Sequence, residues 1–328
     1  MKYLFFLLTT LAAFAQSGKV NGLQLENITY PFPVSEITID SQGQKLQMAY
    51  MDAKPQKANG KTIVLLHGKN FAGYYWEQTA KDLNKAGYRV IMPDQIGFGK
   101  SGKPTNIQYS FQWLAQNTKA VLDKLKIDKA IILGHSMGGM LATRFALMYP
   151  ETTEKLILEN PIGLEDWKTV VPYPSIDDWY ANEIHQTAES IKEYQLKFYF
   201  DNKWKPEYDK GVEMLAGWTR NKDYSIIAKN SALTYDMIFT QPVVYEFQNI
   251  QAPTLLIIGQ RDRTALGKSN ASKEVQATLG NYPKLGKETQ QKIKGSRLVE
   301  IENVGHLPHI EAYEKFIAPL LEFLKVGQ

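Results

Sequence analysis

The segment ILGHSMGGMLA, residues Ile132 to Ala142, places a serine where a nucleophile could lie. An apolar run precedes it and small residues follow, so Ser136 is predicted at a corner between a buried strand and a helix. Such a corner strains the backbone and exposes the hydroxyl at the carboxyl end of a sheet. Gly134 and Gly138 would let the strand and helix approach closely. The segment predicts a serine nucleophile; the alternative is a glycine-rich turn without chemistry.

A serine hydroxyl needs a base, and histidine is the usual one. The chain contains five histidines: His67, His135, His185, His306 and His309. His135 is adjacent to Ser136 and is expected to point away from it, and His67 belongs to an earlier turn. His185 lies in a helical region. The segment NVGHLPHIE follows the last apolar run, so we predict His306 as the base, with His309 as the alternative.

The base in turn needs a carboxylate that fixes its tautomer. Asp262 follows the apolar run TLLII at a predicted strand end, and it is the predicted acid. Glu159 and Asp166, near the end of the preceding run, are the alternatives. Neighbouring arginines also allow Asp262 to be a salt-bridged loop residue. The order serine, acid, histidine is the one associated with a nucleophile at a strand–helix corner.

An oxyanion requires two backbone N–H donors aimed at one point. Met137, directly after the serine, is predicted to supply one. The other is expected from Lys69 in the turn HGKN, where Gly68 permits a sharp reversal, and Asn70 could donate from its side chain. A simple strand-to-helix turn is the alternative interpretation of HGKN.

Six short apolar runs, separated by helical patterns, predict the sheet that brings these residues together. The runs are 61–68, 89–95, 129–136, 154–160, 253–260 and 297–303. Their continuous apolar character is typical of strands buried on both faces. Residues 36–52 alternate around Ser41–Gly43 and predict a hairpin. The predicted class is therefore α/β, a mostly parallel, doubly wound sheet.

The alternation breaks between residues 161 and 247, where about four helical segments follow one another without a clear strand. This insertion holds 16 of the 38 aromatic residues of the chain. We predict a helical cap at 161–247, inserted into a core domain formed by 16–160 and 248–328. Some of its aromatic residues are expected to pack the cap and others to line an apolar substrate pocket. The polar segment 285–295 is predicted to be a solvated helix or loop.

Five motifs, in order, resemble those of the α/β-hydrolase fold family: LLHGKN, PDQIGFGKS, GHSMGG, IIGQRD and VGHLPHIE. The resemblance covers nearly the whole chain after the first residues, and the insertion corresponds to the cap of the family. PDQIGFGKS is similar to a structural turn of the family, so Asp94, Gly97, Gly99 and Ser101 are expected to brace a loop.

The resemblance implies hydrolysis through an acyl-enzyme, with Ser136 as nucleophile, His306 as base, Asp262 as its partner, and the Lys69 and Met137 amides as oxyanion donors. A carboxylic ester or lactone with an apolar moiety is the expected substrate. The alternatives are a carbon–carbon bond hydrolase, an aminopeptidase resembling the proline iminopeptidases with acidic cap residues, a cofactor-free peroxidase-like enzyme and a non-catalytic receptor. HGKN departs from the glycine run of many family esterases, which indicates a restricted acyl site.

The amino-acid composition and the motifs present limit the kinds of ligand that the protein is expected to bind. The net charge of +4 over 328 residues gives no nucleic-acid footprint, and the chain has no cysteine for disulfides or thiol catalysis. His306 and His309 have no third residue at metal-ligand spacing beyond Glu311, and no phosphate loop or dinucleotide fingerprint occurs. We therefore expect a small-molecule substrate, no metal and no cofactor.

Residues 1–15, MKYLFFLLTTLAAFA, have the features of a cleavable signal peptide: a lysine, a short apolar run and a small-x-small ending. A membrane anchor is the alternative, but the run is shorter than the roughly 20 apolar residues that span a bilayer. The sequence predicts cleavage after Ala15 and a periplasmic or secreted protein without a stable membrane span.

Overall fold

The computed structural model describes residues 18–325. The predicted signal peptide, residues 1–15, lies outside this range. Within the described range, no helix combines the length and the apolar character that crossing a membrane requires.

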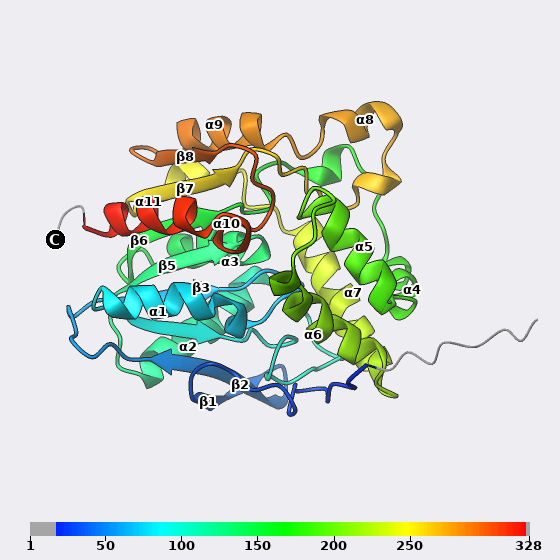
Figure 1. The fold of residues 1–328 in the computed structure, drawn as a ribbon, viewed down its shortest axis with the longest axis horizontal. Coiled ribbons are helices and arrows are strands. Elements are labelled where there is room, and N and C mark those ends of the chain that lie inside the picture. Colours follow the sequence, from blue (N-terminus) through cyan, green and yellow to red (C-terminus); the bar gives the residue numbers. More distant parts are fainter. Residues whose placement is uncertain (1–17, 326–328) are drawn as a thin grey trace, which may run out of the picture.

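An eight-stranded sheet forms the centre of the molecule, in the order β1-β2-β4-β3-β5-β6-β7-β8 (Figure 1). The strands are β1 Val34–Ser41, β2 Gln44–Ala53, β3 Thr62–Leu66, β4 Arg89–Pro93, β5 Ala130–His135, β6 Thr153–Glu159, β7 Thr254–Gly259 and β8 Arg297–Ile301. The first two pair antiparallel as the predicted hairpin, β2 is antiparallel to β4, and the remaining pairs are parallel. The predicted mostly parallel sheet is therefore confirmed.

Helices cover both faces of this sheet. On β3, Val64 and Leu66 pack with the helices of one face, and Ile63 and Leu65 pack with those of the other, as the two-residue period of a strand requires. The first face carries α2 Phe111–Lys124, α3 Met137–Met148 and α9 Tyr282–Lys292, and the second carries α1 Glu77–Lys85 and α11 Tyr313–Lys325. The result is three layers, helix on sheet on helix.

Between β6 and β7 the chain forms α4 Ile176–Ile184, α5 Ala188–Phe198, α6 Asp209–Thr219 and α7 Tyr224–Thr240, and the described residues of this stretch contain no strand. Capping boxes begin two of these helices, at Ser175 and Thr187. Figure 1 shows the four helices grouped at one end of the sheet. Trp179 stacks on Tyr235 at 4.7 Å between ring centroids, so some aromatic residues of this segment pack its own helices.

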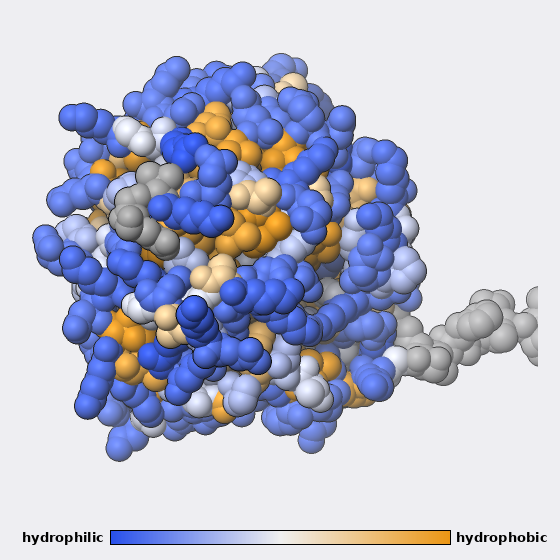
Figure 2. All heavy atoms as spheres, turned by 60° about the vertical axis from the view of Figure 1, so that its left-hand side comes forward, coloured by the Kyte–Doolittle hydropathy of each residue, from blue (hydrophilic) through white to orange (hydrophobic). Residues whose placement is uncertain are grey.

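The chain returns from these helices into β7 and then forms α8 Lys273–Thr278, α9, β8 and the short α10 Pro308–Glu311 before α11. The face shown in Figure 2 is largely hydrophilic, with hydrophobic residues in scattered patches between hydrophilic ones.

Candidate active site

Ser136 lies between the end of β5 and the start of α3, with φ 57° and ψ −121°. This backbone conformation is rare for a residue with a side chain and marks stored strain. The neighbouring glycines leave no room for a Cβ: one built on Gly138 would lie 2.2 Å from the Leu66 carbonyl oxygen, and one on Gly134 would lie 2.0 Å from the Gly138 oxygen. The close approach of β3, β5 and α3 therefore fixes the strained corner that holds the serine.

His306, in the loop between β8 and α10, faces Ser136. Its Nε2 lies 2.9 Å from the Ser136 Oγ, and its Nδ1 lies 2.6 Å from Asp262 Oδ2. Serine and aspartate follow β5 and β7, and the three side chains meet at the carboxyl ends of parallel strands. The structure brings together the three side chains that the sequence singled out, in hydrogen-bonding order.

Asp262 is fully buried and also accepts from the Asn160 side chain at 2.8 Å and from the Thr264 amide at 2.8 Å. Burial alone would raise the pKa of this carboxyl, but His306 and the Thr264 donors outweigh it, and the pKa lies below its ordinary value. Asp262 is therefore held as a carboxylate beside the imidazole. Sequence reasoning missed Asn160, although it directly follows β6 at the same sheet edge.

The alternative residues bond to other partners. Glu159 accepts from the Nδ1 of His309 at 2.8 Å, and Asp166 accepts from the Lys168 amide and the Tyr245 hydroxyl. His67 is buried and accepts from the Gln95 amide through Nε2 at 3.0 Å. His185, which the sequence does not offer as a base, is exposed.

His135 points away from Ser136, as expected, and its ring lies 4.9 Å from that of His306 between centroids. Its Nε2 is 2.7 Å from the His306 carbonyl oxygen, and its Nδ1 is 3.1 Å from the Tyr75 hydroxyl. Burial, and then the neighbouring imidazoles of His306 and His309, lower the pKa of His135 well below its ordinary value. The neutral ring thus donates to the backbone of the loop that carries His306.

The turn after β3 lies against the serine, since a Cβ built on Gly68 would be 3.1 Å from the Ser136 Cβ. Met137 is the first residue of α3, so its N–H has no acceptor within the helix. The Gly68 amide donates to the Tyr75 hydroxyl at 3.1 Å, which leaves the following amide, that of Lys69, as the next donor of the turn. The Asn70 side chain is directed at the Tyr199 hydroxyl at 3.5 Å.

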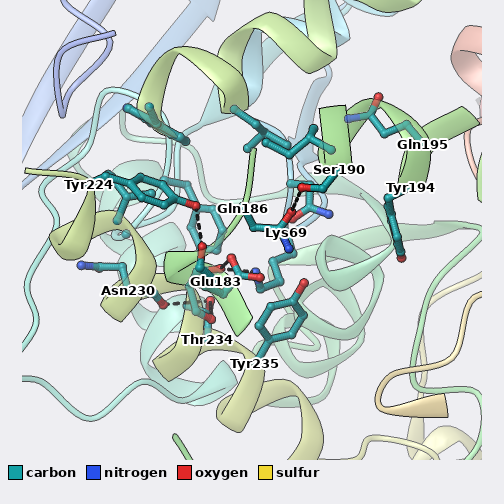
Figure 3. A pocket seen from close by; sticks show the side chains of 18 residues that line it. Lys69, Glu183, Gln186, Ser190, Tyr194, Gln195, Tyr224, Asn230, Thr234 and Tyr235 are labelled. Atoms are coloured by element: carbon teal, nitrogen blue, oxygen red, sulfur yellow. Dashed lines mark hydrogen bonds between the residues drawn. The ribbon is translucent and has the colours of Figure 1, made fainter. Parts of the chain in front are cut away.

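The Lys69 side chain leaves this turn and enters a cavity of about 260 Å³ between the turn and the inserted helices (Figure 3). Its Nζ donates to Ser231 Oγ at 2.6 Å and lies 3.4 Å from the Tyr235 ring centroid. Ser231 in turn donates to Glu183. Burial lowers the pKa of Lys69 to about 8, although Glu183 opposes the shift. Figure 3 shows the Lys69 and Glu183 side chains among those that line the cavity.

The cavity has both apolar and polar walls. Its apolar lining comes from Phe98, Ile191, Leu215, Trp218 and Ile227. Its lining includes Lys69 and Asn70 of the turn after β3, but none of Ser136, Asp262 and His306. Ser136 is 7% exposed, and Tyr199 from the inserted segment stacks on His306 at 5.1 Å between ring centroids. The inserted segment therefore covers the imidazole that bonds to the serine. Nothing in the local sequence pattern singled out Tyr199.

The predicted loop brace is confirmed. The Asp94 carboxylate accepts from the Gly73 and Lys100 amides, each at 2.7 Å, and Ser101 Oγ donates to the Asp94 carbonyl at 2.6 Å. Within residues 18–325, no group of three or more His, Cys, Asp or Glu side chains is arranged to hold a metal ion.

Comparison with known proteins agrees with this architecture. A sequence model of the family described as alpha/beta hydrolase fold matches residues 61–313. Among solved structures, a probable hydrolytic enzyme from Pseudomonas aeruginosa is similar with a TM-score of 0.93 and 53% identity, over 94% of this chain and 99% of that one.

Two curated relatives are named for related substrates. A 2-hydroxy-6-oxononadienedioate/2-hydroxy-6-oxononatrienedioate hydrolase from Comamonas testosteroni is 35% identical over 43% of this chain, which spans about half of that enzyme, 51%. A 2-hydroxy-6-oxo-6-phenylhexa-2,4-dienoate hydrolase from Burkholderia cepacia is 31% identical over 62% of this chain and 72% of that enzyme.

Proposed function

Because the chain belongs to the α/β-hydrolase fold family, we propose that it is a serine hydrolase that cleaves a carboxylic ester or lactone through an acyl-enzyme. The observation that carries the proposal is the hydrogen-bonded chain from Ser136 Oγ through His306 to Asp262. An acceptor 2.9 Å from the hydroxyl can take its proton, and a buried carboxylate can hold the imidazolium that forms.

The reaction proceeds in two halves. Ser136 Oγ attacks the carbonyl carbon while His306 Nε2 takes the hydroxyl proton, and the Lys69 and Met137 amides stabilise the oxyanion. The tetrahedral intermediate collapses, and the leaving alkoxide receives that proton from His306. Water then attacks the acyl-enzyme, gives its proton to His306, and releases the acid as Ser136 regains its hydrogen.

The cavity supports a substrate with an apolar part. The apolar part of the substrate can contact Trp218, Leu215 and Ile227. Its polar groups can form hydrogen bonds with Lys69 and Glu183. Its volume of about 260 Å³ fits a compact group. Since Tyr199 covers His306, the substrate reaches Ser136 when the inserted helices move away from the core.

The test is hydrolysis of p-nitrophenyl esters, from acetate to long acyl chains, by the wild type and its Ser136→Ala and His306→Ala variants. We expect turnover of short esters and a loss of about a thousandfold or more in each variant. If no ester is turned over but a fluorophosphonate labels Ser136, the nucleophile is active on another substrate class. If the probe also fails to label Ser136, the proposed mechanism is wrong.

Carbon–carbon bond hydrolysis is the second candidate, and it is supported by the names of the curated relatives. Their named substrates carry a carboxylate, and Lys69 is the cationic side chain among the described residues that line the cavity. The test is incubation with 2-hydroxy-6-oxo-6-phenylhexa-2,4-dienoate, followed by loss of its absorbance and release of benzoate. Turnover of this compound with none of the esters would favour the second candidate.

An aminopeptidase has less support. Of the acidic cap residues Glu183, Glu189 and Glu193, only Glu183 lines the cavity. Its carboxylate already accepts from Ser231, which binds the Lys69 ammonium. A substrate amine would have to compete with the Ser231 hydroxyl for the carboxylate.

A further inference from the structure

Arg261 directly precedes Asp262 in the loop after β7, and its side chain bonds to three separate parts of the chain. The guanidinium donates to Glu311 Oε1 at 2.6 Å and to the Tyr199 carbonyl at 3.1 Å. It also donates to the Asn303 carbonyl. These acceptors belong to α10, to the inserted segment and to the loop between β8 and α10. One side chain therefore joins the segments that surround the candidate base.

The loop that carries the base is held at each of the three residues before it. All three hydrogen-bond to Arg261 or to its partner Glu311: the Asn303 carbonyl accepts from the guanidinium, the Val304 carbonyl accepts from the Arg261 amide at 2.9 Å, and the Gly305 amide donates to Glu311 Oε2 at 2.7 Å. Asn303 has a φ of 61°, which is uncommon for a residue with a side chain, so the loop turns sharply just before the base. Arg261 and Glu311 fix this turn.

The residue of the inserted segment that Arg261 binds is the one that covers the base. The Tyr199 ring stacks on His306 at 5.1 Å between centroids, with 25° between the ring planes. The Tyr199 carbonyl oxygen lies against the same loop, since a Cβ built on Gly305 would be 2.4 Å from it and 2.8 Å from Arg261 Nη2. The guanidinium thus holds both the loop that carries the imidazole and the residue that stacks on it.

This arrangement needs an arginine. A guanidinium is planar and has five N–H donors in fixed directions, so it can donate to two carbonyls and a carboxylate at once. A lysine ammonium is a single charged point on a flexible chain and does not reproduce this fork. The Arg261 and Glu311 side chains are only 26% and 16% exposed, and each oxygen of the carboxylate accepts a different donor.

We propose that Arg261 is a positioning residue of the candidate active site, which keeps the His306 imidazole in place by fixing the loop before it and Tyr199 beside it. The proposal rests on the proposed function in one respect, since it takes His306 as the base that acts on Ser136. A reacting group displaced by about 1 Å can lose about a hundredfold in rate. Removal of the guanidinium should therefore slow the reaction of Ser136, although Arg261 acts only through its neighbours.

The variants are Arg261→Met, which keeps the aliphatic stem and removes the donors, and Arg261→Lys, which keeps the charge. Arg89→Met is the matched control. Arg89 pairs with Asp52 at 2.7 Å, and the two side chains are 26% and 15% exposed, as in the Arg261–Glu311 pair. Arg89 begins β4, which runs parallel to β3, so it lies at the amino end of the strands, away from Ser136. The control therefore removes an equally buried ion pair without touching the loop of the base.

The first measurement is proton NMR of the hydrogen bond between His306 Nδ1 and Asp262, which should give a low-field resonance. Its assignment follows from its loss in Asp262→Asn. The second buried pair, His309 with Glu159, gives an internal reference from α10. We expect Arg261→Met to shift or broaden the His306 resonance and to leave that of His309 in place, and Arg89→Met to change neither.

The second measurement is the rate at which a fluorophosphonate labels Ser136. We expect labelling to be about a hundredfold slower in Arg261→Met. Arg261→Lys should recover only part of this loss, because the ammonium can bind Glu311 but lacks the fork. Labelling of Arg89→Met should stay within about twofold of the wild type, even if thermal melting shows that both methionine variants lose similar stability.

The proposal is overturned if a folded Arg261→Met has the His306 resonance and the labelling rate of Arg89→Met. If Arg261→Met does not fold, Arg261→Lys decides: a wild-type resonance and labelling rate in that variant would mean that the guanidinium is not needed. Failure of the probe to label the wild type would count against the proposed function instead. The His306 resonance would then still show whether Arg261 holds the imidazole, since it requires no reaction.

Discussion

Glu159 and His309 form a buried pair beside the candidate active site, with Nδ1 and Oε1 2.8 Å apart and a second bond from the His309 amide to the same oxygen. From the sequence these two residues are the alternative acid and the alternative base. The fold pairs them with each other and leaves Asp262 and His306 to Ser136. Two histidine–carboxylate pairs thus lie near the same sheet edge, and it is the imidazole of His306 that bonds to the Ser136 hydroxyl.

Breaking this second pair should cost stability. In Glu159→Ala the buried His309 loses its partner, and we expect the free energy of unfolding to fall by about 3–5 kcal/mol in urea denaturation. The control is Glu322→Ala, which removes an exposed ion pair with Arg297 and should cost less than about 1 kcal/mol. Equal losses in the two variants would contradict a stabilising role for the buried pair.

Asp262→Asn should lower kcat by about 10³- to 10⁴-fold, because a neutral amide neither fixes the tautomer of His306 nor stabilises its charged form. Asp166→Asn is the matched control, since Asp166 caps a short helix and bonds Tyr245 outside the site. Its kcat should stay within about twofold of the wild type. Steady-state kinetics on the best ester decides. A comparable loss in both variants would argue against Asp262 as the partner of the base.

That Ser136, Asp262 and His306 lie together could be expected from the sequence, because each follows an apolar run and parallel strands bring their carboxyl ends to one edge. The same reasoning placed the hairpin and the helical insertion. It missed Tyr199, because its contact with His306 depends on how the inserted helices lie on the core, and no local period encodes that packing.

The segment 285–295 shows a related limit. Its polar composition predicts a solvated helix or loop, but it forms most of α9, and Leu285, Gly286 and Thr289 are buried. A Cβ on Gly286 would lie 3.3 Å from Ile258 of β7. Small and hydroxylated residues can cover a sheet when the helix that carries them lies close to it. A hydrophobicity pattern does not identify a helix face made of such residues.

We propose that the chain is exported and processed, and this predicts a mature protein that begins at Gln16. The intact mass of protein purified from a bacterial expression host should correspond to residues 16–328. Replacing Ala13 and Ala15 together by large residues should abolish cleavage, because signal peptidase requires small side chains there. If the wild type has the mass of residues 1–328 and is found in the cytoplasmic fraction, the export proposal is wrong.

The buried ammonium of Lys69 predicts a pH dependence of stability. Its pKa is lowered to about 8 in the folded chain and is near 10.4 when unfolded, so between these values the unfolded state binds more protons at this residue. The contribution of Lys69 to the free energy of unfolding therefore rises with pH between these two pKa values. The free energy of unfolding of the wild type, minus that of Lys69→Met, should be larger at pH 10 than at pH 7.5. A difference that does not change with pH would mean that Lys69 titrates normally.

Gly138→Ala tests the close packing that shapes the nucleophile corner. The new Cβ would lie 2.2 Å from the Leu66 carbonyl oxygen and 2.8 Å from that of His67, and both are backbone atoms that cannot rotate away. The start of α3 must then move from β3, which displaces Ser136 and the Met137 amide together. We expect a loss of about 1–3 kcal/mol or more in stability and a large fall in kcat.

Gly102→Ala is the matched control for this variant, because its added Cβ would lie 3.5 Å from the nearest atom, the Gln47 carbonyl oxygen, at an ordinary contact distance. Thermal melting and ester hydrolysis should therefore change little in Gly102→Ala. If Gly138→Ala were as stable and as active as this control, the corner would tolerate a wider separation of helix and strand. The strained φ of Ser136 would then not depend on that packing.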